Sequence, residues 1–552
     1  MSNIGYLSIQ ELVINLPDGR PLIKDATFSL GGRERACLIG ENGTGKTTIL
    51  RALLGEVRFS SGNISVHGSP GVLRQVPGGA TVGEMLAETA GTNVTQAYTR
   101  LIRAERAAAV APSDQTHMAL AESIADWDEL GGFELEATWD RLGENVAGRT
   151  FRNLKDLPVE HLSGGEVKRL LLESLLRGPL DPLLLDEPDN YLDVEGKQWL
   201  EDQLTASEKA VLVISHDRYL LHRVATKVVT IERHRTGNRV WVHPGSFDGW
   251  AEARTARVAA VEEDRRRWNE QRARLDSEVK RKRQEAKNND KLASRLKAAK
   301  SRLARFERDP HPERIMAFRG ADVTFEGSRT GKLVLRCEGI GVPGTVDPFN
   351  LELFAGDRVA LVGSNGVGKS ALMHLLATAT SATGADSERR IDVDRDPQTL
   401  DIVGKVQTGT GVRAGYFSQT NRRSDLDGET LLGILHHGHK YRTGIGQEEA
   451  GEFLARYGLA AQSRSTYEAL SGGQQARFQL LLLELEAVNL LFLDEPTDNL
   501  DVDSAESVQR ALQGFSGAAV AITHDRWFAQ SFDKFLNVTR SGQVIGSMSA
   551  PW

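Results

Sequence analysis

Four short motifs occur twice along this chain of 552 residues, each time in the same order. The first set is LIGENGTGKTT (38–48), LSGGE (162–166), LLLDEPDNYLD (183–193) and ISHDR (214–218). The second set is LVGSNGVGKSA (361–371), LSGGQ (470–474), LFLDEPTDNLD (491–501) and ITHDR (522–526). The last three pairs of motifs share one offset of 308 residues, as Glu187 and Glu495 show. Such self-similarity predicts a duplicated domain, hereafter the first and second copy, with a separate segment between the copies.

The first motif of each set has the form GxxxxGK[ST], here called the phosphate loop. Each loop follows a short apolar run and precedes a helical pattern, which is the context that this motif requires. Its glycines let backbone N–H groups converge on phosphate oxygens at a helix N-terminus. Lys46 and Lys369 are expected to reach the β and γ phosphates, and Thr47 and Ser370 to place a hydroxyl on Mg²⁺. The predicted nucleotide-binding residues of the loops are Gly40, Glu41, Asn42, Gly43, Thr44, Gly45, Lys46, Thr47, Thr48, Gly363, Ser364, Asn365, Gly366, Val367, Gly368, Lys369, Ser370 and Ala371.

The runs LLLDEP and LFLDEP are typical of buried parallel strands that end in two carboxylates. Asp186 and Asp494 are predicted to help hold Mg²⁺. Glu187 and Glu495, one residue further on, are predicted to polarise the water that attacks the γ-phosphate. Both are therefore candidate catalytic residues.

Two further motifs complete each set. His216 and His524 each follow an apolar strand-like run and are predicted to contact the γ-phosphate, so they too are candidate catalytic residues. LSGGE and LSGGQ, here called the signatures, each begin a helical pattern with small donor groups. A second phosphate-binding helix start makes sense if each signature caps the nucleotide that the other copy holds. The signature residues predicted to bind nucleotide are Ser163, Gly164, Gly165, Ser471, Gly472 and Gly473.

This set of motifs resembles the ATP-binding cassette superfamily over almost the whole chain outside the middle segment. The resemblance implies an α/β fold of two P-loop ATPase domains that close head-to-tail over two ATP molecules with Mg²⁺. One implied site joins Gly40–Thr48, Gln75, Asp186, Glu187 and His216 with Ser471, Gly472 and Gly473. The other joins Gly363–Ser370, Gln419, Asp494, Glu495 and His524 with Ser163, Gly164 and Gly165. Gln75 and Gln419 are implied metal contacts, and Asp193 and Asp501 match the family's D-loop.

The sequence departs from that family at two places. The family usually stacks adenine on an aromatic side chain some 25 positions before the phosphate loop, where this chain reads LVINLPDGR and RCEGIGVPG. ATP is therefore inferred from the phosphate chemistry, and the preference for adenine stays open. The first copy has Asp189, Asn190 and Tyr191 where the second has Thr497, Asp498 and Asn499, so equal turnover at the two sites also stays open.

The segment between the copies is basic. Residues 251–308 contain 19 Lys and Arg against 10 Asp and Glu, a local charge of +9 in a chain whose net charge is −7. Apolar residues at heptad-like spacing, interrupted at Asn288–Asp290, predict an antiparallel helical hairpin. The predicted domains are a first cassette at 1–245 with a helical insertion near 92–138, a linker at 246–319 and a second cassette at 320–552. The second copy is also expected to carry a loop-like insertion around 381–402.

Twin cassettes, the basic linker and the sequence HPGSFDGWAEAR (243–254) together resemble the ABC-F family, as does the arm-like insertion in the first cassette. That resemblance implies binding to the ribosome at the tRNA exit site, with the linker directed toward the P-site tRNA. ATP would favour the bound state, and hydrolysis would release it. Contacts with rRNA or tRNA are expected through the phosphate backbone. The candidate RNA-contacting residues are Lys280, Arg281, Lys282, Arg283, Lys287, Lys291, Arg295 and Lys297.

The sequence leaves other functions open for the linker and for the cassettes. The linker charges could serve solubility alone, and the cassettes could belong to a transporter or to a DNA-repair assembly. Within the ribosomal interpretation, the short polar linker tip favours a general translation factor over a protein that displaces ribosome-targeting antibiotics. No signal-peptide pattern or membrane-spanning run is visible, so a cytoplasmic monomer without a membrane domain is expected. The two cysteines, Cys37 and Cys337, are expected to be buried thiols.

Overall fold

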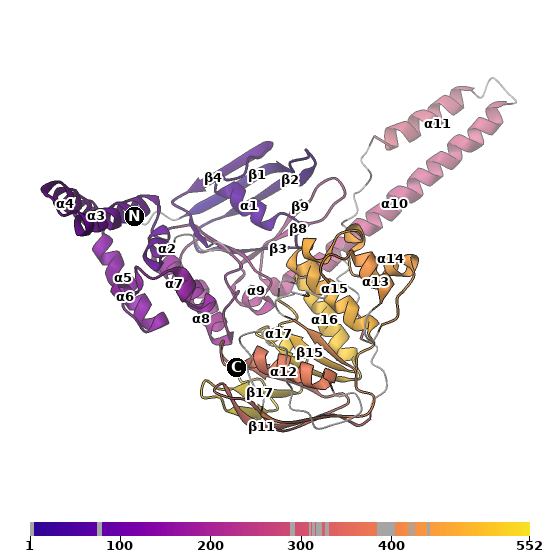
Figure 1. Cartoon of the computed structure of the whole chain (residues 1–552). Coiled ribbons are helices and arrows are strands. Elements are labelled where there is room, and N and C mark those ends of the chain that lie inside the picture. Colours follow the sequence, from indigo (N-terminus) through magenta and orange to yellow (C-terminus); the bar gives the residue numbers. More distant parts are fainter. Residues whose placement is uncertain are drawn as a thin grey trace. The chain divides into compact units, whose positions relative to one another are not determined.

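The structure is a computed structural model that divides into two compact units (Figure 1). The first unit comprises Met1–Gly68, Lys209–Leu212 and Ala225–Phe318, and the second comprises Ser69–Glu208, Val213–Val224 and Arg319–Trp552. The residues that the structure describes are 5–73, 80–287, 293–308, 311, 315, 323–325, 331–382, 403–418, 423, 426–438, 442–498 and 500–552. The predicted linker break at 288–290 and most of the predicted insertion at 381–402 lie outside these residues.

The first unit contains a three-stranded antiparallel sheet of order β2-β1-β4. Its strand β3 pairs in parallel with β8, and β8 pairs antiparallel with β9. Alternation of buried and exposed residues in β2, where Ala26, Phe28 and Leu30 are buried, directs one face of the antiparallel sheet to the core. The elements are β1 (Tyr6–Asn15), β2 (Pro21–Leu30), β3 (Arg35–Gly40), α1 (Lys46–Leu53), β4 (Ser61–His67), β8 (Lys227–Glu232), β9 (Arg239–His243), α10 (Phe247–Lys287) and α11 (Ala293–Phe306).

The linker helix α10 is anchored on the β8–β9 hairpin. The Trp250 indole N–H donates to the Thr230 hydroxyl at 2.8 Å. Arg257 pairs with the buried carboxylate of Glu232 at 3.1 Å, and its guanidinium lies 5.4 Å from the ring centroid of Trp241. The base of the linker is therefore held by specific contacts.

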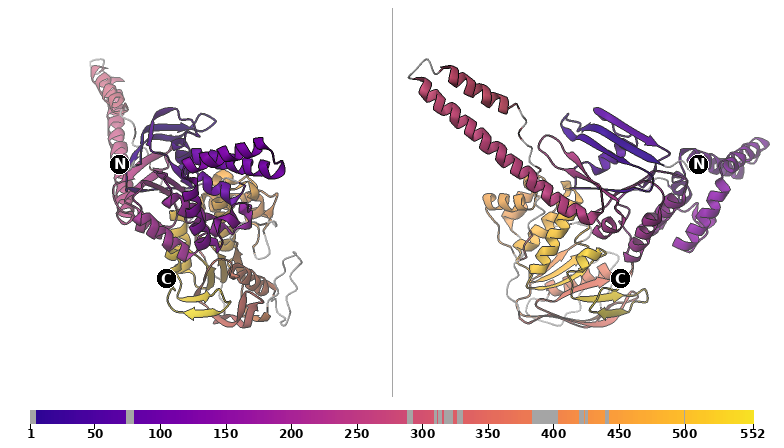
Figure 2. Two further views of the ribbon diagram at one scale, coloured as in Figure 1. Left: turned by 90° about the vertical axis from the view of Figure 1, so that its left-hand side faces the viewer. Right: turned by 180° about the vertical axis from the view of Figure 1, so that it is seen from behind.

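Helices α10 and α11 form an antiparallel hairpin (Figures 1 and 2). The ring centroids of Trp268 and Phe306 lie 5.2 Å apart, and Arg272 pairs with Glu307 at 2.9 Å. Ala299 is buried among these helices, whereas most of their other side chains are partly or fully exposed. The predicted helical hairpin linker is thus confirmed.

The second unit contains a mostly parallel six-stranded sheet of order β14-β15-β16-β12-β17-β18. Its central strands are apolar along their length because helices cover both faces, as is typical of parallel sheets. A second, antiparallel sheet has the order β11-β10-β13. The second-copy elements are β10 (Leu333–Val342), β11 (Val346–Phe354), β12 (Arg358–Val362), α12 (Lys369–Ala382), β13 (Val403–Thr408), β14 (Ala414–Phe417), α13 (Leu431–His437), α14 (Gln447–Arg456), α15 (Gly472–Leu485), β15 (Leu490–Asp494), α16 (Val502–Gly514), β16 (Ala518–Ile522), α17 (Arg526–Ala529), β17 (Lys534–Val538) and β18 (Val544–Ser547).

The same unit includes most helices of the first copy. Where an insertion was predicted near 92–138, the chain forms three helices that continue to Ala147, and α3 and α4 lie side by side (Figure 2). Buried Trp127 and Trp139 join these helices, with ring centroids 6.3 Å apart. The elements are β5 (Gly71–Leu73), α2 (Val82–Glu88), α3 (Thr92–Val110), α4 (Asp114–Glu129), α5 (Gly132–Ala147), α6 (Phe151–Leu154), α7 (Gly164–Arg177), β6 (Leu183–Asp186), α8 (Val194–Ala206) and α9 (Arg218–Val224); β7 (Val211–Ile214) has residues in both units.

Two remaining expectations concern cysteines and membranes. Cys37 and Cys337 are both buried and free, and burial raises the pKa of each thiol to about 12. Within the described part of the chain, no helix combines the length and apolar character needed to cross a bilayer. The α/β fold with two P-loop cassette domains agrees with the sequence-based prediction.

Candidate nucleotide-binding site

The phosphate loop of the second copy connects the end of β12 to the start of α12. Gly363 has a φ of 138°, and a Cβ there would overlap the carbonyl oxygen of Val538, so only glycine fits this position. Lys369 is 6% exposed, and its ammonium donates to the carbonyls of Gly363 at 2.9 Å and Ser364 at 2.8 Å. Burial lowers the pKa of Lys369, which nearby carboxylates oppose. The loop is thus a buried cationic cradle at a helix N-terminus, suited to phosphate.

Strand β15 delivers Asp494 to the same place. Asp494 is 3% exposed, and the Ser370 hydroxyl donates to its Oδ1 at 3.3 Å. Burial raises the pKa of Asp494 to about 6, although the hydrogen bond from Ser370 opposes that shift. A hydroxyl and a carboxylate oxygen side by side are hard ligands of the kind that Mg²⁺ takes together with phosphate oxygens and water. These two residues therefore fit a magnesium ion.

Glu495 follows Asp494 and lies against His524. Its Oε2 accepts a hydrogen bond from the backbone N–H of His524 at 3.0 Å, and its Oε1 lies 3.5 Å from the imidazole Nε2. Burial, with a further contribution from the charge of Asp498, raises the pKa of Glu495 to about 8. Burial and the nearby charges of Lys369 and Lys197 lower the pKa of His524 to about 3, so the imidazole is neutral at pH 7. A buried carboxyl group, whose ionisation its surroundings disfavour, and a neutral imidazole thus adjoin the phosphate loop.

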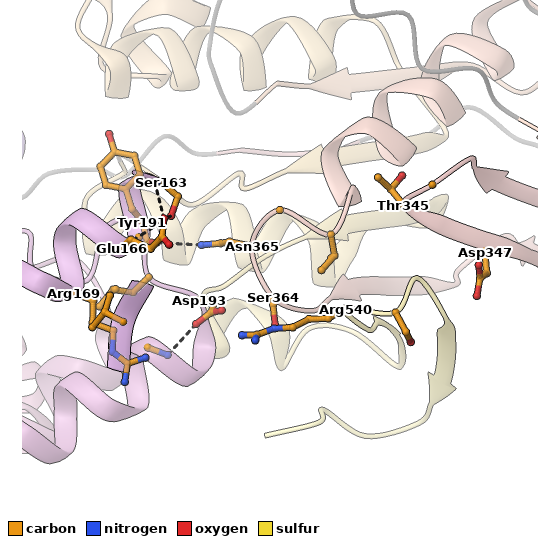
Figure 3. A pocket seen from close by; sticks show the side chains of 18 residues that line it. Ser163, Glu166, Arg169, Tyr191, Asp193, Thr345, Asp347, Ser364, Asn365 and Arg540 are labelled. Carbon is orange, nitrogen blue, oxygen red and sulfur yellow. Dashed lines mark hydrogen bonds between the residues drawn. The ribbon is translucent and has the colours of Figure 1, made fainter. Parts of the chain in front are cut away.

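The signature of the first copy faces this loop across a cavity of about 750 Å³ within the second unit (Figure 3). Ser163 caps α7, and its side chain and that of Glu166 form a reciprocal capping box. Asn365 in the phosphate loop donates to the backbone carbonyl of Tyr191 at 3.1 Å. The lining residues are Val146, Ser163, Gly165, Glu166, Arg169, Tyr191, Leu192, Asp193, Gly196, Gly344, Thr345, Asp347, Ser364, Asn365, Gly366, Val367, Arg540 and Ser541. One cavity is therefore built from both copies, in the head-to-tail sense.

Sequence reasoning missed several residues of this cavity. Arg169 lines it from α7 and lies 5.1 Å from the ring centroid of Trp199. Arg540 and Ser541 come from the turn between β17 and β18. A signal for this turn was available, because RSGQ (540–543) repeats RTGN (235–238) of the first copy. Both turns are therefore a fifth recurring motif.

The phosphate loop of the first copy lies in the first unit. Lys46 donates to the carbonyls of Gly40 at 2.7 Å and Glu41 at 3.2 Å, which matches the arrangement around Lys369. Asn238, from the repeated turn, donates to the Thr44 carbonyl at 2.9 Å. The loop thus has the same local geometry as its repeat.

The residues predicted to complete the first site belong to the second unit. There Asp186 is 4% exposed, and the Glu187 carboxylate accepts a hydrogen bond from the Asn190 amide at 2.6 Å. Ser471 caps α15, as Ser163 caps α7. Gln75 and Gln419, the implied metal contacts, lie outside the described residues.

The basic linker residues lie near the end of the hairpin. Lys280 and Arg281 are 76% and 69% exposed, and Lys280 pairs with Asp276 at 2.8 Å. Lys282 is 21% exposed and pairs with Glu285. Arg283, Arg295 and Lys297 are exposed. Lys287 ends α10, although its side chain lies outside the described part, and Lys291 lies outside it entirely.

The family model described as ABC transporter matches residues 23–190 and 346–498. With two such matches and the paired motifs above, the chain belongs to the ATP-binding cassette family and is an ATP hydrolase. Within that family it is a twin-cassette protein of the ABC-F group, as its relatives indicate. Both the predicted family and the predicted enzyme class are confirmed.

Three relatives illustrate this placement. An "Antibiotic resistance protein" of Mycobacteroides abscessus is 43% identical over 553 residues, covering 100% of both chains. "ATP-binding protein Uup" of Caulobacter vibrioides is 31% identical, covering 93% of this chain and 74% of that one. "Energy-dependent translational throttle protein EttA" of Mycobacterium tuberculosis is 28% identical, covering 92% and 86%.

Solved structures support the fold. The archaeal ribosome recycling factor aABCE1, in complex with the ribosomal stalk protein aP1, matches with a TM-score of 0.54 at 16% identity, covering 96% of this chain and 87% of that one. The RNase-L inhibitor matches with a TM-score of 0.53 at 17% identity and the same coverage. At these identities the likeness shows the twin-cassette fold alone.

Proposed function

We propose that this protein binds the ribosome at the tRNA exit site when ATP closes its cassettes, and that it modulates translation through the α10–α11 hairpin. The observation that carries the proposal is the hairpin itself, which is anchored at its base and exposes cations such as Lys280 and Arg281. Exposed cations without any base-reading motif suit contact with the phosphate backbone of structured rRNA or P-site tRNA. The relative named a translational throttle protein supports this choice of partner.

The proposed chemistry at the second-copy site assigns one task to each residue. Lys369 binds the β and γ phosphates, and Ser370 with Asp494 holds Mg²⁺, which neutralises charge that develops on the phosphates. Glu495 orients the attacking water, and the neutral imidazole of His524 contacts the γ-phosphate. At the other site Lys46, Thr47, Asp186, Glu187 and His216 are proposed to take the same tasks.

ATP acts as a switch because its contacts come from both copies. The phosphate loop of the second copy and the signature Ser163 of the first line one cavity. A nucleotide that touches both stabilises the closed form by its differential affinity for that form, and hydrolysis removes the difference. ATP binding is thus proposed to favour the ribosome-bound state, and hydrolysis to favour release.

A second candidate function is displacement of ribosome-targeting antibiotics. The short polar linker tip favours a general translation factor, but the relative that is 43% identical over its full length bears the name "Antibiotic resistance protein". Both candidates share ribosome binding. Expression in a susceptible host, followed by growth under a panel of ribosome-targeting drugs, separates them: a raised inhibitory concentration supports resistance, and an unchanged one supports the general role.

The test of the proposal is sedimentation of the E187Q/E495Q variant with 70S ribosomes through a sucrose gradient. Comigration that requires ATP is the expected result, since this variant is proposed to bind ATP without hydrolysing it. Absence from the ribosomal fractions, with ATP binding intact, would reject the ribosome as the partner. That outcome would favour the transporter or DNA-repair alternatives.

A further inference from the structure

The two copies differ in charge at three positions that follow the candidate catalytic glutamates in the chain. All three pairs obey the offset of 308 residues that relates Glu187 to Glu495. The paired positions are Asp189 and Thr497, Asn190 and Asp498, and Lys197 and Ala505. The copies therefore place different charges at equivalent places.

Lys197 contacts the histidine loops of both copies. It lies on α8 of the first copy, where its side chain is 11% exposed. Its ammonium pairs with Asp217, the neighbour of His216, at 3.0 Å, and donates to the backbone carbonyl of His524 at 3.3 Å. A single buried cation thus joins the two loops.

Two hydrogen bonds, both made by the backbone of His524, connect Lys197 to Glu495. The backbone N–H of His524 donates to Glu495, and the backbone carbonyl of His524 accepts from Lys197. Both backbone groups of His524 are therefore held, one by the carboxylate and the other by the opposite copy. Fixed backbone groups keep the imidazole and the carboxylate in one relative position.

The two copies hold their candidate catalytic glutamates through different groups. In the first copy the Asn190 amide donates to Glu187 at 2.6 Å. In the second copy Asp498 stands at the position of that amide. Glu495 accepts from the backbone N–H of His524, whose carbonyl in turn accepts from Lys197.

We propose that Lys197 is a positioning residue for ATP hydrolysis at the site that contains Glu495, which it serves from the opposite copy. Ala505 occupies the matching position of the second copy, so the site that contains Glu187 receives no lysine from the opposite copy at that position. Lys197 reaches the His216 loop only from within the first copy, through Asp217. The two ATP sites are therefore inequivalent. The proposal rests on the proposed catalytic role of Glu495.

The test isolates each site in the full chain. E187Q leaves hydrolysis to Glu495, and E495Q leaves it to Glu187. K197M keeps the apolar stem of the side chain and removes its charge. In the E187Q background it should lower kcat for ATP about 10- to 100-fold, with KM changed by less than about 3-fold, the range typical of outer-shell partners. The fold-loss of kcat in the E187Q background should exceed the fold-loss in the E495Q background at least about tenfold. K197R, which keeps the positive charge, should recover most of the lost kcat.

A control variant removes a lysine that belongs to the second copy itself. Lys534 pairs with Asp357 at 3.0 Å, but it begins β17, whereas the phosphate loop follows the opposite end of the neighbouring parallel strand β12. K534A should leave kcat unchanged within about twofold, because it touches no group of the site. An equal loss from K197M in both backgrounds, or no loss in either, would overturn the proposal.

The double variant distinguishes a failure of the role proposed for Glu495 from a failure of the role proposed for Lys197. If E187Q/E495Q retains the turnover of E187Q, the proposed role of Glu495 fails; if it does not and K197M has no effect, only the role of Lys197 fails. K197M also leaves buried Asp217 without its cation, which can impair folding. Should the variant melt early, K197M/D217N removes the stranded charge while still releasing His524, and the same loss of kcat is expected.

Discussion

Arg526 of the second copy forms a buried ion pair with Glu201 of the first. Their repeat equivalents also meet, since Arg218 donates to the side-chain oxygen of Gln509 at 3.0 Å. Each arginine stacks on the aromatic residue that follows the other: Arg218 lies 5.3 Å from the ring centroid of Trp527, and Arg526 lies 4.6 Å from that of Tyr219. These contacts form a reciprocal interface between the copies within the second unit, with a carboxylate on one side and an amide on the other.

E201A should destabilise the protein by about 3 kcal/mol, because it leaves the buried guanidinium of Arg526 without its counter-charge. E201Q should cost less, since Gln509 shows that an amide serves as the acceptor at the equivalent place. Chemical unfolding of both variants measures the difference. Equal losses would mean that the charge of Glu201 contributes nothing beyond the hydrogen bond.

G363A should abolish nucleotide binding at the second-copy phosphate loop. The added Cβ meets the carbonyl oxygen of Val538, and the positive φ of Gly363 adds about 1–2 kcal/mol of backbone strain. Titration of the variant with a fluorescent ATP analogue should show one binding site instead of two. G446A is the control, because Gly446 has open space around it and a φ of −66°; it should bind like the parent protein.

The stability that the Glu232–Arg257 pair gives to the base of the linker should depend on pH, because Glu232 titrates. Burial alone would raise the pKa of this carboxyl, but His234 at 3.8 Å and the hydrogen-bonded Arg257 outweigh it and hold the pKa below its ordinary value of 4.5. A depressed pKa stabilises the fold at neutral pH, and that contribution is lost as the pH falls below 4.5 through the folded-state pKa. The stability difference between the parent and E232Q should therefore shrink with acid. A difference that is constant from pH 7 to about pH 3 would contradict this assignment.

Charge reversal near the hairpin end should weaken ribosome binding. R281E/R283E is expected to reduce the slope of log K against log salt by about 0.7–0.9 for each phosphate that is no longer neutralised. R266E/R267E makes the same change of charge at exposed positions nearer the base of α10, and it should leave the slope nearly unchanged. Equal effects of the two variants would indicate a non-specific electrostatic contribution. No effect of either would return the linker charges to a role in solubility.

E187Q/E495Q should abolish ATP turnover while ATP binding persists, because the amide keeps the shape of the side chain and loses the basic oxygen. Steady-state release of phosphate measures ATP turnover, and equilibrium titration measures ATP binding. Retained hydrolysis would remove both residues from the catalytic role.

Much of the candidate site could be predicted from the sequence because its chemistry is local. A phosphate loop needs glycines where the backbone has positive φ and a lysine at a helix start, and these requirements fall within eight consecutive residues, 363–370. The duplication then predicted two cassettes, and the apolar spacing of 251–308 predicted the helical hairpin. Such patterns are set by the covalent order of residues and by backbone sterics.

Only the tertiary structure showed which side chains from distant segments meet. The contact of Lys197 with His524 spans 327 residues, and that of Asn365 with Tyr191 spans 174. No short pattern encodes such pairs, because they depend on how the packing of the second unit presents α8 and the first signature to the second phosphate loop. The sequence by itself determined the cassettes, their phosphate loops and the linker. The tertiary structure decided that one cavity is shared between the copies and that a buried lysine of one copy holds the histidine loop of the other, because burial and contact arise only when segments far apart in the chain pack together.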